Sequence, residues 1–455
     1  MSRASSLWLA LALVAPASLR AQQTVAPGEP QSCILQFEGT NTRTQLVKLP
    51  SGRYNAFQGG GVTYHCQGQG NTLVADSAEY YGDQHLLYLI GHVHYSEPRM
   101  KLDSQRLTYY TADEHIIAQG GVVATLPSGT TMRGPIAEYW RIIPTVRPVT
   151  RMLATGRPNI QLVQRDSSGK PQPPVNVDAD RVTMVADSLV YAAGKVLITR
   201  PDLIATGDSA FMDTGREFAR LMKKPQINGK SERPFSLAGD LIDLYSRQRL
   251  LQRVVALGNA HAVSQDLDLR SDTLDLRVRD NKLQRAFAWG ASRARAVSPT
   301  QQITADSLDV VMPDQQVREV RAVRRAYAQT MPDTLRVHSP ERDWLSGDTI
   351  TAHFDTVPHA ADTTSGPRIR ELVARGNARS FYQIAASSPT KPAVNYVRGS
   401  TITVAFEAQQ VHTVTVGGLE GGVYLSPQSP DSTAKRGTTA ADSARHARPP
   451  HGAPR

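Results

Sequence analysis

The chain has 455 residues, of which 40% are hydrophobic and 6% aromatic, with 51 Lys and Arg against 41 Asp and Glu. This composition is typical of a thin, extended sheet structure rather than a thick globule, and the length allows one large core or two domains. The formal net charge of +10 favours anionic partners, but a secretory N-terminus and the lack of any nucleic-acid-binding motif argue against nucleic acid.

The N-terminus has the features of a secretory signal peptide. Arg3 precedes an apolar run at residues 7–17, and small residues continue to Ala21, so we expect residues 1–21 to be removed after export. An uncleaved signal anchor is the alternative. No later stretch is long and apolar enough for a membrane helix, so the mature protein is expected to be soluble outside the cytoplasm.

The two cysteines, Cys33 and Cys66, both lie early in the expected mature chain. In an oxidising compartment they are expected to form one disulfide that ties the first strands into a cap. A redox role is not indicated, because the sequence has no paired-cysteine motif.

Composition divides the mature chain into two strand-rich runs. Residues 33–163 form the first run and residues 181–426 the second. Between them, residues 164–180 are polar and contain Pro171, Pro173 and Pro174, so we expect a linker or long loop. Residues 427–455 consist mainly of Pro, Ser, Ala and Arg with almost no apolar residues, which predicts a disordered tail.

A two-part motif recurs about every 25 to 40 residues between Leu73 and Gly422. One half-motif has apolar or small residues around an Asp, as in the segment from Leu269 through Asp272 to Leu276. The other alternates small and apolar residues, commonly with Gly near its end, as from Leu283 to Gly290. Strict period-two alternation predicts half-buried strands, so each unit is interpreted as two strands.

The apolar spacing changes from even to odd at the recurrent Asp, as a bulge or corner would require. We therefore expect the Asp to cap a bend. Calcium binding is the alternative, but the glycine-rich nonapeptide of such sites is missing. If each unit is one bent layer, ten layers at about 4.8 Å each give a body on the order of 50 Å long.

The bent units are expected to stack their apolar faces into one continuous trough. Large residues of the first strand then face small residues of the second, which either close-pack or leave a cleft for acyl chains. The predicted lining residues are Ile242, Leu244, Leu274, Leu276, Leu308 and Val310 on the first strands, and Ala256, Gly258, Ala286, Ala288, Gly290, Ala374 and Gly376 on the second.

Arginines recur on the polar face of the second strands, and we take Arg293, Arg321 and Arg375 as candidates for binding anionic head groups near the rim. A simple solvated surface is an equal alternative. The two ends of the stack would expose strand edges, which can pair with another chain.

The Ala-Asp-Ser corners at residues 75–77, 186–188 and 305–307, and the returning Gly-x-Val or Gly-x-Ala strands at residues 91–93 and 258–260, resemble the periplasmic lipopolysaccharide-transport proteins of the LptA, LptC and OstA-like type. The resemblance covers most of the mature chain. It implies a folded-over antiparallel β-jelly roll, open along one side, that shields lipid A acyl chains and passes them along a head-to-tail bridge of such proteins through the periplasm. The chain is longer than single-module members, which leaves open one long module, two modules joined near Pro173, or a paralogue with other duties.

The sequence contains no G-x-S-x-G, no phosphate-binding glycine loop and no H-E-x-x-H, and we do not expect an enzyme or a cofactor. His92 and His94 form the only close histidine pair, without a third ligand nearby, so no metal site is expected. The leading hypothesis is binding and transport of lipopolysaccharide or a related anionic amphiphile. A cell-envelope scaffold that assembles through its strand edges is the alternative, and a polysaccharide-processing β-helix enzyme is a third possibility that lacks the acidic cluster it would need.

Overall fold

The computed structural model describes residues 33–38, 43–165, 169–186, 188–230, 234–248, 250–264, 267–280, 282–298, 301–330, 339, 341–355, 368–384, 392–407 and 410–426. They form one antiparallel sheet of 27 strands and a short 3-10 turn, η1 (Pro313–Gln315), which confirms the predicted all-β fold. The predicted signal peptide, residues 1–21, and the predicted tail, residues 427–455, lie outside this description. In the part described, no helix has the length and apolar character needed to cross a membrane.

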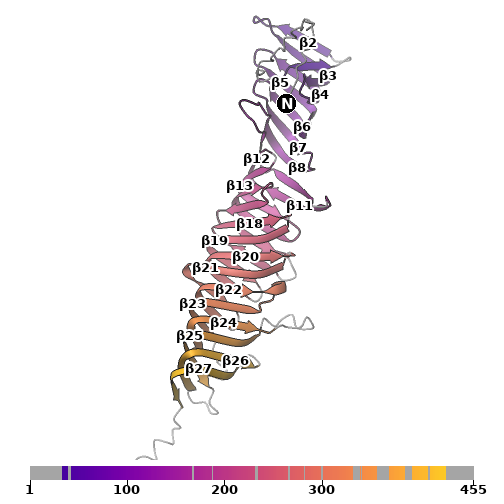
Figure 1. Ribbon diagram of the computed structural model, residues 1–455. Helices are drawn as coiled ribbons and strands as arrows, with labels where there is room; N and C mark the ends of the chain where they lie inside the picture. Colours follow the sequence, from indigo (N-terminus) through magenta and orange to yellow (C-terminus); the bar gives the residue numbers. More distant parts are fainter. Residues whose placement is uncertain are drawn as a thin grey trace, which may run out of the picture.

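The sheet is folded over along its length into a long, narrow stack (Figure 1). Seventeen strands continue through the fold and belong to both of its halves. They are β3 (Tyr54–Cys66), β4 (Thr72–Tyr81), β5 (Leu86–Glu97), β6 (Met100–Tyr110), β7 (His115–Thr125), β8 (Thr131–Trp140), β13 (Leu189–Thr199), β14 (Leu203–Asp213), β19 (Leu250–Ser264), β20 (Asp268–Arg279), β21 (Lys282–Val297), β22 (Gln301–Val311), β23 (Glu319–Thr330), β24 (Trp344–Phe354), β25 (Ile369–Ile384), β26 (Ala393–Glu407) and β27 (Gln410–Leu425).

Five further strands are interrupted at the fold, and each half pairs with one half of a neighbouring strand. These split strands are β1 (Leu35–Glu38) with β2 (Arg43–Lys48), β9 (Arg151–Thr155) with β10 (Asn159–Arg165), β12 (Arg181–Val185) with β11 (Pro171–Asp178), β15 (Phe218–Met222) with β16 (Gln226–Gly229), and β18 (Leu241–Arg247) with β17 (Phe235–Ala238). The described chain therefore makes 22 layers, or a body about 100 Å long at about 4.8 Å per layer. The expectation of ten layers is wrong, because each half-motif supplies a complete bent strand.

Four names describe the folded sheet. Wall A contains β2, β9, β12, β15 and β18 with the matching halves of the continuous strands, and wall B contains β1, β10, β11, β16 and β17 with the other halves. The spine is the line of bends that joins the walls, marked by Asp76 and Gly376. The mouth is the opposite side, where the turns between successive strands lie, such as the turn from Arg200 to Asp202.

The recurrent Asp lies at the spine, as predicted, against a glycine of the next strand. Gly376 has a φ of +74°, and a Cβ at that position would lie 2.3 Å from Oδ2 of Asp348. The Asn377 side-chain amide donates to the same carboxylate at 3.3 Å. Only glycine combines this backbone conformation with such a close approach. The same contact recurs in the pairs Asp76/Gly91, Asp180/Gly194, Asp240/Gly258 and Asp272/Gly290.

One predicted corner is not a corner. Ala186 and Ser188 lie in the turn between β12 and β13 at the mouth, while Asp187 lies outside the described residues. Asp180, seven residues before Asp187 in the sequence, faces Gly194 at the spine instead. The motif Ala-Asp-Ser therefore fits both a sharp turn and a bend, because Asp and Ser side chains favour either conformation.

The prediction of a linker or long loop at residues 164–180 is also wrong for the second half of this segment. Residues 171–178 form β11, which pairs with β10 and β13, so the sheet continues from the first run into the second. The three prolines lie in the part of β11 that pairs with β10 alone. No described strand lies along the other edge of β11 there, so the N–H groups that proline lacks are not needed for hydrogen bonds to β13. Val175 and Val177 face the core.

The inner face of wall A carries a row in which large and small side chains alternate from strand to strand. Ile242 pairs in register with Ala256, Ala256 with Leu274, Leu274 with Ala288, and Ala288 with Leu308. The expectation that large residues face small ones across the trough is therefore wrong, since they are neighbours on one wall. Members of this row are at most 1% exposed, so the two walls pack together near the spine.

Candidate functional site

An apolar cleft opens at the mouth over β14 to β21. It contains about 850 Å³ of empty space, part of which is continuous with solvent. Wall B contributes Leu203, Ile227, Phe235 and Leu237, and wall A contributes Leu244, Leu251, Val254, Leu276, Val278 and Leu283. The polar lining residues are Asp202, Lys230 and Gln315. The cleft therefore has an apolar lining with a few polar groups, which is typical of sites that bind small molecules.

Strand alternation decides which side chains reach the cleft. Leu250 is 56% exposed on the outer surface, whereas its neighbour Leu251 lines the cleft. Leu244 and Leu276 lie two residues nearer the mouth than Ile242 and Leu274 on the same strands, in the next inward-facing row. All four side chains point inward. In this row Leu244 pairs with Val254 and Val254 with Leu276, so large apolar residues on three adjacent strands line the cleft.

Only two of the predicted lining residues, Leu244 and Leu276, line this cleft. The other inward ones are packed between the walls and are at most 1% exposed: Ile242, Ala256, Leu274, Ala286, Ala288, Leu308, Val310 and Ala374. These residues form the closed floor beneath the cleft and the stack beyond it.

The three predicted lining glycines lie at the spine and do not line the trough. Gly258, Gly290 and Gly376 each face an Asp carboxylate of the neighbouring strand. Their small size serves the bend, because any side chain there would meet that carboxylate.

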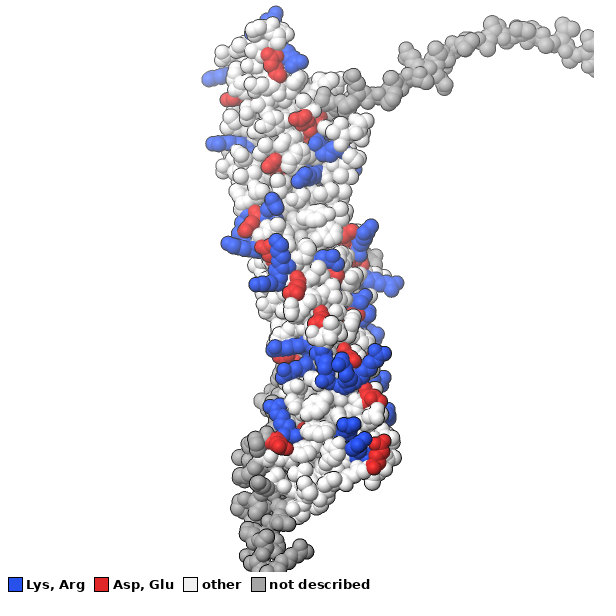
Figure 2. Space-filling model, turned by 90° about the vertical axis from the view of Figure 1, so that its left-hand side faces the viewer, with Lys and Arg blue, Asp and Glu red and all other residues white. Residues whose placement is uncertain are grey.

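The predicted head-group arginines lie away from the cleft. Arg293 and Arg375 lie at the spine, on the side opposite the mouth, and the guanidinium of Arg293 donates to the backbone carbonyl of Arg325. Arg321 lies on the outer face of wall A and pairs with Glu319 at 3.2 Å. Figure 2 shows a dense group of Lys and Arg side chains below the middle of one face of the molecule. The structure does not bring the three arginines to the mouth.

Two smaller openings follow along the mouth toward the C-terminus. One of about 330 Å³ lies between Ile303 of wall B and Val320 and Phe354 of wall A. The next, of about 230 Å³, lies beside Leu345 and Leu372. Both openings are shallow, because most of their empty space is open solvent.

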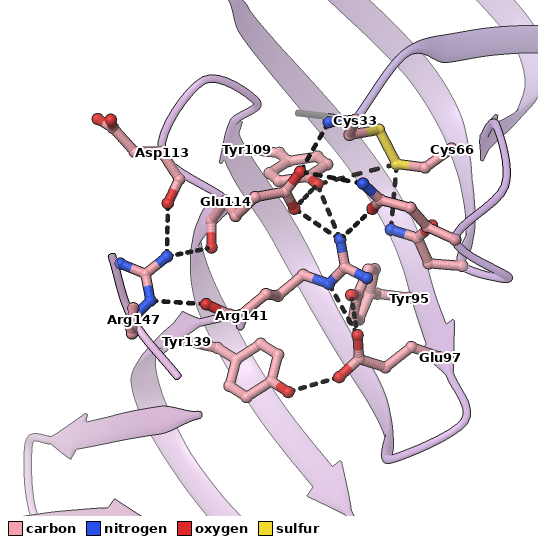
Figure 3. Close-up of polar contacts among 12 residues, drawn as sticks. Cys33, Cys66, Tyr95, Glu97, Tyr109, Asp113, Glu114, Tyr139, Arg141 and Arg147 are labelled. Atoms are coloured by element: carbon pink, nitrogen blue, oxygen red, sulfur yellow. Dashed lines mark hydrogen bonds and ion pairs between the residues drawn. A yellow bond between two sulfur atoms is a disulfide. The ribbon is translucent and has the colours of Figure 1, made fainter. Parts of the chain in front are cut away.

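A polar cluster closes the mouth in the first layers (Figure 3). Nε of Arg141, from wall A, donates to Glu97 of wall B at 2.8 Å, and Nη1 donates to Glu114 at 2.6 Å and to Gln69 at 2.6 Å. The backbone N–H of Cys33 donates to Glu114 at 2.7 Å. Because Arg141 and both carboxylates are largely buried, the cluster forms a tie between the walls that excludes water.

Tyrosines fill the space beneath this tie. Tyr95 and Tyr109 are at most 1% exposed, and their hydroxyls donate to Glu97 and Glu114. Burial raises the pKa of Tyr109 far above its ordinary value, so its hydroxyl stays protonated and remains a donor. Burial opposes the charge of Arg141, but the surrounding tyrosines and carboxylates raise its pKa overall. The first layers are thus filled, whereas β14 to β21 are open.

The predicted disulfide between Cys33 and Cys66 is present and lies against this cluster. Asn71 donates its side-chain amide to Sγ of Cys66 at 3.1 Å. The bond joins the start of β1 to the end of β3, and with it the first layer to the second.

The two close histidines do not share a partner. His92 lies 2.8 Å from a carboxylate oxygen of Asp76, and His94 lies 2.5 Å from one of Asp103. Among the described residues, no group of three His, Cys, Asp or Glu side chains could hold a metal ion.

Sequence reasoning missed the wall B side of the cleft. Ile227 and Phe235 belong to the four-residue strands β16 and β17, which are too short to show a periodic pattern. Lys230 lies in the turn between them, and turn residues lie at the mouth in this fold. The positions of the turns in the sequence could therefore have indicated which residues lie at the rim of the cleft.

No protein-family model matches this sequence, and no curated protein is significantly similar to it.

Proposed function

We propose that this protein binds an acyl-chain amphiphile, lipopolysaccharide or a related anionic lipid, in the periplasm and carries it toward the outer membrane. The observation that supports this most directly is the 850 Å³ apolar cleft between the two walls. An apolar surface open to water is costly unless a ligand covers it, and each buried methylene contributes about 0.8 kcal/mol to binding. An acyl chain can lie along the mouth over several layers.

The ends of the stack support assembly with other sheet proteins of this kind. In the described chain, β27 pairs with β26 alone, so its outer edge offers free backbone groups. Leu419, Tyr424 and Leu425 of β27 are more than half exposed, as are Ile34 and Leu46 near the other end. We propose that edge pairing, head to tail, joins this chain to a partner of related fold.

Site-specific crosslinking tests the proposal. A photoreactive residue at Leu251 or Leu283, in the cleft, is expected to form adducts with lipopolysaccharide or another envelope lipid in cells. Matched outward positions on the same strands, Leu250 and Trp289, are expected to label weakly. Mass spectrometry of the adducts identifies the cargo. Equal labelling from inward and outward positions would contradict the proposal.

A filled cleft supplies the second test. Leu251→Trp is expected to occupy the cleft and to reduce adducts formed from Leu283, whereas Leu250→Trp changes only the outer surface. Circular dichroism of both variants checks that the sheet is intact.

A scaffold of the cell envelope is the second candidate, because the floor between the walls is closely packed. In that case the strand edges alone would act, and the purified protein would carry no lipid. Extraction of the purified protein followed by lipid mass spectrometry distinguishes the two functions.

A further inference from the structure

The cleft contains one cation among its lining residues, and its position differs from that of the arginines. Lys230 follows β16 and lines the cleft at the mouth from wall B. Its backbone N–H donates to the carbonyl of Asp202 at 2.8 Å, which holds the turn against the start of β14. Lys230 is exposed, and its ammonium group forms no ion pair with another described residue.

Two acidic residues near the rim in the described part of the chain, Asp202 and Asp314, already have basic partners. The Asp202 carboxylate accepts two hydrogen bonds from Arg200, at 3.0 and 3.2 Å. On the opposite wall, Asp314 pairs with Lys282 at 3.3 Å. Among the described residues that line the cleft, Lys230 is therefore the cation that can meet an anionic head group. A second polar group, the Gln315 side chain, lines the cleft from wall A.

The size of the cleft limits what it can cover. The empty space of about 850 Å³ includes open solvent, so the enclosed part of the cleft is smaller than this. Toward the N-terminus the mouth is closed by the tie at Arg141, so the cleft does not continue into the first layers. One or two acyl chains fit such a space, whereas a larger bundle of chains exceeds it.

We propose that Lys230 is the head-group residue of this cleft, and that it binds the carboxylate or phosphate of an amphiphile whose one or two acyl chains lie against Leu251, Leu276 and Leu283. This assignment rests on the proposed function and narrows it to a class of ligand. An ammonium group is a compact, strongly hydrated charge on a flexible stem, so it can follow a head group at the water boundary. The guanidiniums at the spine lie on the opposite side of the sheet and do not take part.

The test compares three probes with the same chain: dodecanoate, dodecyl phosphate and the neutral dodecyl maltoside, each titrated below its micelle concentration into the full-length mature protein. Isothermal titration calorimetry is expected to show that Lys230→Gln weakens binding of an anionic probe roughly three- to tenfold. Binding of the neutral probe is expected to stay unchanged. Lys230→Arg is expected to retain the affinity, and Arg375→Gln to have no effect on any probe. Whichever anionic probe loses more affinity identifies the head group as carboxylate or phosphate.

Added salt gives an independent readout, because a partly exposed charge pair is screened. Raising the salt concentration is expected to weaken binding of the anionic probes to the wild-type protein more than to Lys230→Gln. If the wild type binds the probes but Lys230→Gln changes all three equally, or none, the assignment of Lys230 is wrong while the cleft remains a lipid site. If the wild type binds no probe and Leu251→Trp makes no difference, the proposed function and this assignment both fail.

Discussion

The close contact between Asp348 and Gly376 at the spine predicts that adding one methyl group to Gly376 strongly destabilises the fold locally. In Gly376→Ala, the new Cβ would lie 2.3 Å from Oδ2, 2.8 Å from Cγ and 2.9 Å from Cβ of Asp348. Movement of the carboxylate alone does not relieve the contact with its Cβ, so the whole Asp348 side chain and part of β24 must shift. The shift would separate Asp348 from the Asn377 amide.

The expected cost combines two contributions. An L-residue in the left-handed region at φ +74° costs roughly 1–2 kcal/mol, and loss of one partly exposed hydrogen bond costs about 0.5–1.5 kcal/mol. We therefore expect Gly376→Ala to destabilise the local structure by about 2–3 kcal/mol. The residue after the corner glycine can also have positive φ and yet tolerate a side chain, as Asn259 and Asn377 show. Gly121, at φ +59° with free space around its Cβ position, is the matched control, and Gly121→Asn should be nearly neutral.

A stack of layers unfolds locally, because each layer contacts only its neighbours. The suitable assay is therefore hydrogen exchange read strand by strand, and not one global midpoint. Gly376→Ala should speed exchange in β24, β25 and β26 by a factor of about 30 to 150, and leave β5 to β7 unchanged. Unchanged exchange in β24 to β26, or an equal loss of protection in Gly121→Asn around its own corner, would refute the steric account.

Three further predictions concern the first layers and the corners. Arg141→Met leaves buried carboxylates without a partner and should cost about 3–5 kcal/mol, measured as lost exchange protection in β5 to β8; no loss would contradict the tie between the walls. Reduction of Cys33–Cys66, 33 residues apart, should cost about 3–4 kcal/mol, measured by denaturant unfolding with and without reductant, and equal midpoints would contradict it. A hydrogen bond from the backbone of Ser292 lowers the pKa of Asp272, so this corner is most stable above the unfolded pKa of about 3.8 and loses stability as pH falls below it. Unfolding of the wild type and Asp272→Asn between pH 6 and 3 checks this, because the variant should lack that part of the pH dependence.

The sequence predicts the strands and the bends for a simple physical reason. Alternation fixes which side chains of a strand face inward, and Leu274 and Leu276 are both buried as expected. The change of spacing at Asp272 coincides with the register shift between Arg270 and Thr273 in the β20–β21 pair. Both signals are local, so a single sequence contains them.

The rim of the cleft could not be predicted in the same way. Alternation separates the inner face from the outer face, but it does not tell whether a residue lies near the spine or near the mouth. Arg375 and Lys230 are both exposed cations, yet one lies at a bend and the other at a turn between strands. The position along the strand decides between them, and it requires knowing that each half-motif is a whole bent strand.

The same logic explains why the cleft opens where it does. Over β14 to β21 the mouth is lined by apolar side chains, such as Phe235 of wall B and Leu251 and Leu283 of wall A. In the first layers, by contrast, tyrosines and the Arg141 tie fill the corresponding space. The side chains at the mouth, large and polar in the first layers and mostly apolar over β14 to β21, thus separate a packed stack from one that can admit a chain.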